Sequence, residues 1–429
     1  MKYVHRLLLD RLKEGFKKNR IIIITGSRQV GKTTLMNMYK GNIPNDRPCF
    51  YFNLEDVGSL NICQNIDSLR SYLADNGIDI KKDNLFLIID EFHYIKNATK
   101  LFKLIYDLYP KIKILASGSS SIEIQKHLKE SLAGRKRVYH LYPLSFEEFV
   151  RFKSEEEYAR YTKLGSCHIS SALSKIYTCD YLKDYLLFGS YPKVTLLGSK
   201  TEKIEELEDI YNSYIQKDIK SLLRGEDISA YNNLLKVLSS QIGNLLNINE
   251  LSNSLKISRR QIVKYLSVLE GTFIIKLLNP FSFNKRTEIS KMPKIYLLDT
   301  GIANFSSGNF GQIDYRPNLG SFIENFVLCE IIKYKPVYFQ VYFWRTKVGA
   351  EIDFILEGNN ELIPVEVKWQ KSIRPATPKS FVSFFTKYEN IKKAVVVTKD
   401  LSCKIRWQDK DLYFVPASLF SKCIAKLTG

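Results

Sequence analysis

The sequence predicts an α/β protein made of several domains. In residues 1–150, short apolar runs alternate with helical stretches, and this order is typical of a parallel sheet covered by helices on both faces. Residues 151–240 are rich in Glu, Lys, Leu and Tyr and are expected to be helical, while strand-like alternation returns after residue 294. The 429-residue length allows more than one domain, at roughly 100–200 residues each.

The predicted strands are short and apolar, and most are followed by a turn or a polar residue. In the N-terminal part they are Ile21–Thr25, Cys49–Leu54, Leu85–Asp90, Ile112–Ser117 and Val138–Leu141. In the C-terminal part they are Ile295–Leu298, Val341–Trp344, a hairpin within 351–368, and Ala394–Thr398. The domains expected from these changes of pattern are 1–150, 151–240, 241–300 and 301–429.

Composition excludes several classes of protein. The seven cysteines contain no CxxC pair, which argues against a disulfide framework or a zinc site and favours a reducing, cytoplasmic location. The first residues, MKYVHRLLLDRLKEGF, are interrupted by charge every few positions, so they predict an amphipathic helix and no signal peptide. No apolar run approaches the roughly 20 residues needed to span a bilayer, so no membrane partner is expected.

The chain is strongly basic. Its formal net charge is +19, and the excess is distributed over the whole sequence without a basic tail. Such a bias favours a polyanionic partner, for which nucleic acid, and DNA in particular, is the expected candidate.

The segment IIIITGSRQVGKTT combines an apolar strand, a glycine-containing loop and the start of a helix. It matches GxxxxGK[ST], the P-loop, in which backbone N–H groups and the helix N-terminus face phosphates. Lys32 is expected to reach the β- and γ-phosphates of ATP, and the Thr33 hydroxyl to ligate Mg²⁺. The residues predicted to bind the nucleotide are Gly26, Ser27, Arg28, Gln29, Val30, Gly31, Lys32, Thr33 and Thr34.

A second acidic motif follows the buried strand in LFLIIDEFHYI. Its position after a P-loop is that of a Walker B motif. Asp90 is expected to hold Mg²⁺ and bind the nucleotide, and Glu91 to polarise the attacking water as the catalytic base. An acidic pair at a strand end can also cap a helix.

The next strand, KIKILASGSSS, ends in a polar tip at which Ser117 or Ser119 is expected to sense the nucleotide. The basic segment LAGRKRV follows. This order of motifs resembles the AAA+ ATPases, and GxRQVGKTT with LAGR resembles a bacterial and archaeal subgroup whose C-terminal half is an uncharacterised domain. The resemblance implies that Arg135 is an arginine finger reaching a neighbouring subunit, and that the protein is a homo-oligomer. The alternative for Arg135 is a solvated basic turn.

Residues 247–278, NINELSNSLKISRRQIVKYLSVLEGTFIIKLL, predict a winged helix-turn-helix. Ser258 and Gln261 have the spacing of a capping box for the second helix. Arg259, Arg260 and Lys264 on that helix suit contact with DNA phosphates, although many winged helices contact protein instead.

The hairpin EIDFILEGNNELIPVEVK, residues 351–368, places two acids and a lysine on neighbouring strands. An acid, then Glu-x-Lys, after a helix with a further acid resembles the PD-(D/E)xK restriction-endonuclease-like fold. That resemblance implies that Asp353 and Glu366 are catalytic ligands of Mg²⁺, with Lys368 activating the water and Glu324 assisting in metal binding from the helix. The proline expected near the first acid is absent, and Pro364 precedes Glu-x-Lys instead. The alternatives are an exposed hairpin with surface charges, or a nuclease fold that binds DNA without cutting it.

Together these patterns predict an ATP-binding and ATP-hydrolysing AAA+ protein coupled to a DNA-acting, Mg²⁺-dependent nuclease-like domain. The alternatives are an ATP-switched DNA- or protein-binding module whose nuclease fold is silent, and a signalling scaffold that oligomerises on ATP.

Overall fold

The computed structural model describes residues 3–119, 132–165, 177–214, 228–282, 292–370 and 373–428. The chain divides into two compact units. The N-terminal unit consists of Met1–Tyr142 with Ser213–Leu222 and Gly271–Phe273. The C-terminal unit consists of Pro143–Asn212, Leu223–Glu270 and Ile274–Gly429.

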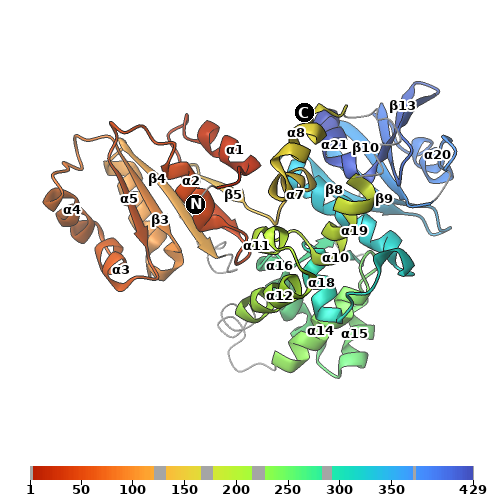
Figure 1. The fold of residues 1–429 in the computed structure, drawn as a ribbon, viewed down its shortest axis with the longest axis horizontal. Helices are drawn as coiled ribbons and strands as arrows, with labels where there is room; N and C mark the ends of the chain where they lie inside the picture. The colour runs from red at the N-terminus through yellow and green to blue at the C-terminus, as the bar shows by residue number, and fades with distance from the viewer. Residues whose placement is uncertain are drawn as a thin grey trace. The chain divides into compact units, whose positions relative to one another are not determined.

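The N-terminal unit contains a five-stranded sheet in the order β2-β3-β4-β1-β5, in which every neighbouring pair is parallel (Figure 1). Its strands are β1 (Ile21–Gly26), β2 (Cys49–Asn53), β3 (Leu85–Asp90), β4 (Ile112–Ser119) and β5 (Lys136–His140). Its helices are α1 (Leu7–Gly15), α2 (Lys32–Lys40), α3 (Val57–Cys63), α4 (Ile66–Asp75) and α5 (Ala98–Leu108). The parallel sheet predicted from alternating strands and helices is therefore present.

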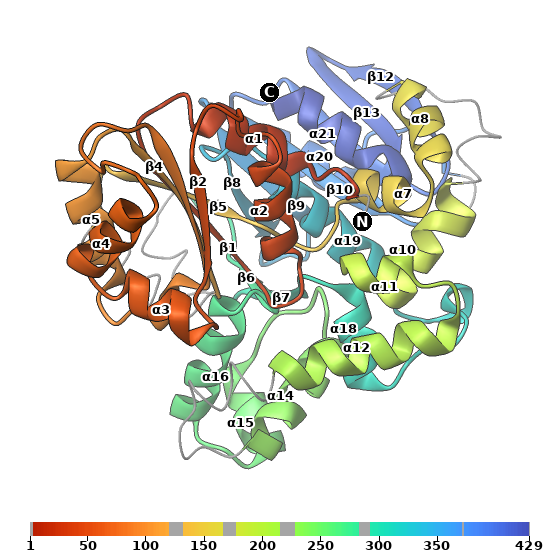
Figure 2. The same ribbon diagram turned by 60° about the vertical axis from the view of Figure 1, so that its left-hand side comes forward.

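Helices cover both faces of this sheet, with α1 and α2 on one side and α3, α4 and α5 on the other (Figure 2). The burial pattern explains why. All six residues of β1 and all six of β3 are buried, so successive side chains of each strand enter opposite cores. Leu85, Leu87 and Ile89 pack with Leu101 and Phe102 of α5.

The C-terminal unit begins with a helical region. Its helices before the strands are α7 (Phe146–Lys153), α8 (Glu155–Lys163), α10 (Leu182–Phe188), α11 (Pro192–Leu196), α12 (Lys200–Tyr214) and α14 (Ile228–Ser240). Ser145 and Glu148 form a complete capping box at the start of α7. In the described ranges of the chain, no helix is both long and apolar enough to cross a bilayer.

The predicted helix-turn-helix segment forms α15 (Ile248–Leu255) and α16 (Arg259–Gly271), followed by β6 (Ile275–Leu278) and β7 (Lys294–Leu297). The predicted capping box is confirmed, because Ser258 N donates to Gln261 Oε1 at 3.1 Å and Gln261 N donates to Ser258 Oγ at 3.2 Å. Strands β6 and β7 pair antiparallel, and Leu245 forms an isolated bridge with Lys294.

A six-stranded mixed sheet completes the unit, in the order β12-β13-β11-β10-β9-β8. Its strands are β8 (Gln340–Arg345), β9 (Glu351–Gly358), β10 (Glu361–Lys368), β11 (Lys393–Thr398), β12 (Cys403–Trp407) and β13 (Lys410–Pro416). The helices that pack on it are α19 (Leu319–Tyr334), α20 (Lys379–Phe385) and α21 (Phe420–Thr428), whereas α18 (Thr300–Ser307) packs with α10 and α14. Strand β11 is parallel to β10 and β13, and the remaining pairs are antiparallel.

The predicted hairpin is confirmed as β9 and β10. Its turn residues Asn359 and Asn360 have φ values of 52° and 57°, the left-handed pair that a two-residue type I′ turn requires. The paired residues run from Gly358 with Glu361 to Phe354 with Val365. Asp353 and Glu366 are the next residues along the two strands, so the turn sets the register that brings them near each other.

Candidate functional site

The glycine-containing loop lies between β1 and α2. A side chain at Gly26 would collide with the carbonyl oxygen of Leu141, so only glycine allows the strand to leave the sheet here. Gln29 and Gly31 have φ values of 57° and 95°, and these left-handed residues curl the loop before α2 begins. The loop therefore has the backbone shape that aims N–H groups at an anion.

Lys32 is held against this loop. Its side chain is only 6% exposed, and Nζ donates to the carbonyl oxygens of Gly26 at 3.2 Å and Ser27 at 3.1 Å. The same ammonium lies 4.0 Å from Glu91 Oε1. The structure thus places the predicted phosphate-binding cation beside the predicted base.

Asp90, at the end of β3, is the centre of a hydrogen-bonded group. Thr33 Oγ1 donates to its Oδ2 at 2.6 Å, and Tyr51 OH donates to the same oxygen at 2.9 Å. Ser117 Oγ donates to the other carboxylate oxygen. Asp90 is 1% exposed, so these hydroxyls compensate the cost of burying its charge. The two predicted Mg²⁺ ligands, Thr33 and Asp90, are therefore adjacent.

Glu91 follows in a left-handed conformation, with φ 55° and ψ 48°. Its Oε2 lies 3.1 Å from Nδ1 of His93. Burial by itself would raise the pKa of Glu91, but the adjacent His93 imidazole and the charges of Lys32 and Arg28 outweigh it and lower this pKa to about 2. Glu91 is therefore a fully ionised carboxylate held by neighbouring donors.

The remaining residues of the predicted nucleotide site are distributed around the loop. Arg28 is half-buried and Thr34 is exposed, whereas Val30 is completely buried. Arg6 Nη1 donates to the Val30 carbonyl oxygen at 3.0 Å, and no feature of the sequence assigned it this role. Ser119 ends β4 beside Gly26, but its side chain lies outside the described residues.

Arg135 lies at the other edge of the sheet. Its carbonyl oxygen accepts from Ile21 N at 2.9 Å, at the start of β1, whereas the loop follows the end of β1. Its Nε donates to Asp107 Oδ1 at 2.7 Å, and its guanidinium lies 6.0 Å from the centre of the Tyr106 ring. The structure therefore does not bring Arg135 to the nucleotide loop of its own chain.

In the C-terminal unit, acids of the hairpin and of α19 surround a lysine for which the sequence predicts no role. Lys294, on β7, is 3% exposed. Its Nζ lies 3.1 Å from Glu324 Oε1 and 2.6 Å from Glu351 Oε1. Burial would lower the pKa of Lys294, but the carboxylates of Glu324, Asp353 and Glu351 outweigh burial and raise it. Lys294 is therefore a charged ammonium at the centre of an acidic group.

Asp353 is half-buried on β9. Its Oδ2 accepts from Val367 N at 2.7 Å. Burial, together with the charge of Glu324, holds the pKa of Asp353 well above its ordinary value, although Lys294 and the Val367 N–H act in the opposite direction.

Glu366 and Lys368 lie together on β10. Lys368 Nζ forms an ion pair with Glu366 Oε1, and Ser380 Oγ donates to Glu366 Oε2. Glu324, the predicted ligand on helix α19, accepts hydrogen bonds from Tyr296 OH and from Lys294 Nζ. Each predicted catalytic carboxylate of this unit therefore already has donors from the protein.

These contacts do not fit a divalent cation. A magnesium site needs several oxygen ligands turned toward one point, whereas Glu324, Asp353 and Glu366 accept from separate donors of the protein. Within the described ranges, no three His, Cys, Asp or Glu side chains are grouped so that they could hold a metal ion. The predicted ligands instead have partners within the protein: Glu324 pairs with Lys294, Asp353 accepts from Val367 N, and Glu366 pairs with Lys368.

The exposed face of α16 carries Arg259, Arg260 and Lys264, as expected from the sequence. Ile262 and Tyr265 of the same helix are completely buried, so packing fixes the helix while the cations remain at the surface. Arg259 and Arg260 form no ion pair with any residue that the structure describes.

Four site residues had weak signals in the sequence. Tyr51 stands in the strand CFYFN, and only the adjacency of β2 to β3 brings it to Asp90. His93 stands two residues after Glu91, a spacing that could have marked it. Lys294 and Tyr296 alternate along one strand, KIYL, which places both side chains on the same face.

Family comparisons divide the chain into three matched segments. Residues 18–150 match a family described as "AAA domain". Residues 179–312 match "Domain of unknown function (DUF8612)", and residues 319–420 match "Domain of unknown function (DUF4143)". The N-terminal segment is thus a P-loop ATPase domain of the AAA type, and it contains the loop and the acidic motif.

Among solved structures, the Walker-type ATPase PABY2304 of Pyrococcus abyssi is 15% identical and aligns over 71% of this chain and 96% of its own, with a TM-score of 0.45. The Aeropyrum pernix ORC1 protein, solved in complex with DNA, is 12% identical over 72% of this chain and 93% of its own, with a TM-score of 0.31.

Similar proteins occur in bacteria and archaea. An uncharacterized protein of Haemophilus influenzae is 22% identical over 370 residues, which cover 82% of each chain. The uncharacterized protein MJ1544 of Methanocaldococcus jannaschii is 30% identical over 355 residues, 81% of this chain and 74% of the relative. Identity at this level over most of both chains shows common descent, and the chain therefore belongs to the same protein family as MJ1544.

Proposed function

We propose that this protein binds and hydrolyses ATP in its N-terminal unit and uses the nucleotide state to control binding of DNA by its C-terminal unit. The observation that carries the proposal is the convergence of Lys32, Thr33, Asp90 and Glu91 at one edge of the sheet. Thr33 Oγ1 is 2.6 Å from Asp90 Oδ2, and Lys32 Nζ is 4.0 Å from Glu91 Oε1. A cation, a hydroxyl and two acids in this arrangement suit phosphoryl transfer.

The loop supplies the binding groups. Its backbone N–H groups and the start of α2 attract the phosphates of ATP, and Lys32 exchanges the carbonyl oxygens of Gly26 and Ser27 for phosphate oxygens. Mg²⁺ would be held by the Thr33 hydroxyl and the Asp90 carboxylate, which already lie side by side. When bound, the ion neutralises phosphate charge and orients the phosphates.

The base and the cation are linked in this proposal. A carboxylate with a pKa of about 2 accepts a proton poorly near neutral pH. Transfer of Lys32 from Glu91 toward the phosphates removes one positive charge from the carboxylate, so its pKa rises. ATP binding would therefore activate the base that hydrolyses it.

We propose that the C-terminal domain has a restriction-endonuclease-like fold that does not cleave. The arrangement of β9, β10 and α19 with Asp353, Glu366 and Lys368 supports the fold. Lys294, which offers a fixed positive charge among the acids, supports the silent alternative over the Mg²⁺-dependent nuclease. DNA cleavage by the parent protein with Mg²⁺ or Mn²⁺ would reverse this conclusion.

The proposed DNA-binding element is a winged helix formed by α15, α16, β6 and β7. The exposed cations of α16 and the net charge of +19 support it, because a basic helix surface suits phosphate contacts. The protein is proposed to act as a homo-oligomer, in which Arg135 would reach the nucleotide of a neighbouring copy.

Two substitutions test the ATPase proposal. Lys32→Ala is expected to abolish ATP binding in calorimetry, because the loop loses its central cation, while Lys100→Ala, an exposed lysine of α5, is the matched control. Glu91→Gln should bind ATP as the parent does and lose about 10²- to 10⁴-fold in turnover, the usual contribution of a general base. Equal ATP affinity in Lys32→Ala and the parent would refute the assignment.

A further inference from the structure

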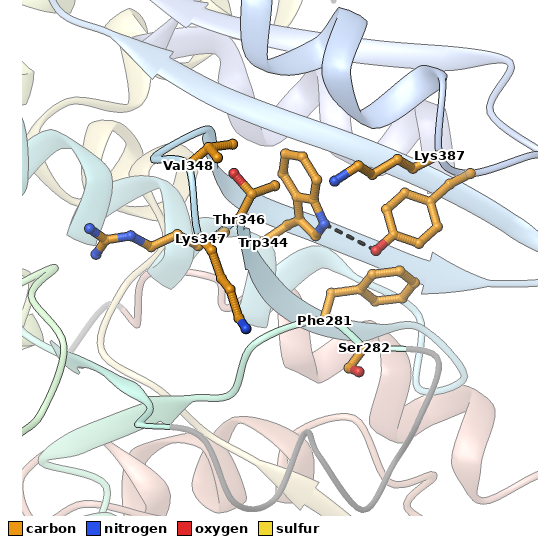
Figure 3. Close-up of a pocket in the computed structure, with 9 residues that line it drawn as sticks. Phe281, Ser282, Trp344, Thr346, Lys347, Val348 and Lys387 are labelled. Atoms are coloured by element: carbon orange, nitrogen blue, oxygen red, sulfur yellow. Dashed lines mark hydrogen bonds between the residues drawn. The ribbon is translucent and has the colours of Figure 1, made fainter.

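A pocket of about 380 Å³ lies beside the edge strand β8, within the C-terminal unit (Figure 3). This volume is in the range of about 300–1,000 Å³ that is usual for ligand sites. The residues that line it are Phe281, Ser282, Trp344, Arg345, Thr346, Lys347, Val348, Lys387 and Tyr388. None of them belongs to the nucleotide site.

One wall of the pocket is aromatic and fixed. Trp344 is 3% exposed, and its Nε1 donates to Tyr388 OH at 3.1 Å. The ring of Phe281 lies 5.3 Å from that of Tyr388 in an edge-to-face arrangement. Packed rings of this kind hold their position without a ligand, so this wall is preorganised.

The turn between β8 and β9 forms another wall. Thr346 N donates to the Ala350 carbonyl oxygen at 2.9 Å, and Ala350 N donates to Thr346 Oγ1 at 3.0 Å. Gly349, with φ 90°, closes the turn. Lys347 and Val348 therefore stand at the tip of a closed turn, where Val348 is 92% exposed.

The polar groups of the pocket are mainly cationic. Lys387 Nζ lies 5.5 Å from the centre of the Trp344 ring, and Figure 3 shows Trp344 between the turn with Lys347 and the segment with Lys387. Arg345, which also lines the pocket, forms an ion pair with Glu351, and its Nε lies 3.5 Å from Glu351 Oε2. Over the ranges that the structure describes, neither lysine forms an ion pair, so the pocket carries two uncompensated positive charges.

We infer that this pocket binds one nucleotide of a single-stranded nucleic acid, with its phosphate on Lys347 and Lys387 and its base against the half-buried ring of Tyr388, which Trp344 and Phe281 hold from behind. Cations beside aromatic rings are the usual combination for strands whose bases are unstacked. A concave site admits a base only when that base has left the duplex, which distinguishes this pocket from the exposed face of α16. The inference rests on the proposed action on DNA and names the form of DNA that the C-terminal domain engages.

The test is fluorescence anisotropy with labelled oligothymidylate and with labelled duplex, titrated with the full-length protein over a series of KCl concentrations. Lys347→Ala/Lys387→Ala should make the salt slope for the single strand shallower by about 1.4, since each single-strand phosphate contact contributes about 0.7. Lys404→Ala/Lys410→Ala removes the same charge from β12 and β13 and should leave that slope unchanged.

Further measurements distinguish an error in the pocket assignment from an error in the proposed DNA binding. Lys347→Ala alone, with an expected change of about 0.7, keeps the test valid if the double variant does not fold. An unchanged single-strand slope in both pocket variants would overturn the pocket and leave DNA binding intact. Competition by thymidine monophosphate as strong as that by the oligonucleotide would also overturn it, because the ligand would then be a free nucleotide. Failure of the parent to bind either DNA would instead refute the proposed function itself.

Discussion

Replacing Lys294 with methionine removes the central cation of the C-terminal acidic group while keeping a long unbranched side chain. In the parent, Nζ lies 3.1 Å from Glu324 and 2.6 Å from Glu351, and the side chain is 4% exposed. Breaking a buried ion pair costs about 3–5 kcal/mol because a carboxylate is left buried and unpaired. Glu351 is 30% exposed and can recover some hydration, so a loss of about 3 kcal/mol is expected.

Equilibrium unfolding in urea measures this loss selectively. The three tryptophans, Trp344, Trp369 and Trp407, all lie in the C-terminal unit, so intrinsic fluorescence reports on that unit. With an m-value of about 2 kcal/mol/M, a loss of about 3 kcal/mol lowers the midpoint by about 1.5 M. Lys276→Met is the matched control, because Lys276 pairs with Glu270 at 2.7 Å but is 43% exposed, and such surface pairs contribute about 0–1 kcal/mol.

Magnesium provides the second readout. Without Lys294, the acids of the group repel one another, so Mg²⁺ should raise the unfolding midpoint of Lys294→Met and leave that of the parent unchanged. The reasoning fails if Lys294→Met costs no more than Lys276→Met. It also fails if the parent is stabilised by Mg²⁺, since the acids would then form a metal site despite the lysine.

Other predictions concern both units. His93→Ala should raise the pKa of Glu91 from about 2 toward its ordinary value, because the imidazole beside the carboxylate is lost; the acidic limb of the kcat/KM profile for ATP should then move to higher pH, and an unmoved limb would exclude this coupling. Arg135→Ala should leave ATP affinity intact and slow hydrolysis only in the assembled oligomer. If the oligomer of this variant hydrolyses ATP as fast as the parent, Arg135 is not an arginine finger and its role is the ion pair with Asp107. Asp353→Asn should stabilise the C-terminal unit at pH 7, because the raised pKa of Asp353 means that folding opposes its ionisation; the gain should shrink as pH falls toward 3.8, and a gain independent of pH would refute it.

The nucleotide site was predictable because its main residues are close in sequence. A strand, a loop and the first turn of α2 place Gly26, Lys32 and Thr33 within a few residues, so local backbone geometry nearly determines their arrangement. Asp90 could be added because parallel strands end at a common edge of the sheet. The same rule could have placed Arg135 at the opposite edge, since it precedes its strand.

The partners of these residues were not predictable in the same way. Tyr51 contacts Asp90 because β2 lies next to β3. The order of the strands in the sheet could not be predicted from the sequence. The pocket beside β8 likewise joins segments that are more than a hundred residues apart, from Phe281 to Tyr388.

The sequence by itself determined the strands of the parallel sheet, the nucleotide loop, the capping box of α16 and the turn of the β9–β10 hairpin, because each depends on residues within a few positions of one another; the strands β12 and β13 were not predicted. Only the tertiary structure decided what the acids of that hairpin do. The hairpin pattern brought Asp353 and Glu366 together and the resemblance to a nuclease-like fold implied a metal, but the pairing of β7 with β6 and the packing of α19 bring Lys294 to Glu324 from 30 residues away. The pKa of a carboxylate depends on its burial and on the charges near it in space, and at Asp353 these are Glu324, which raises the pKa, and Lys294, which lowers it.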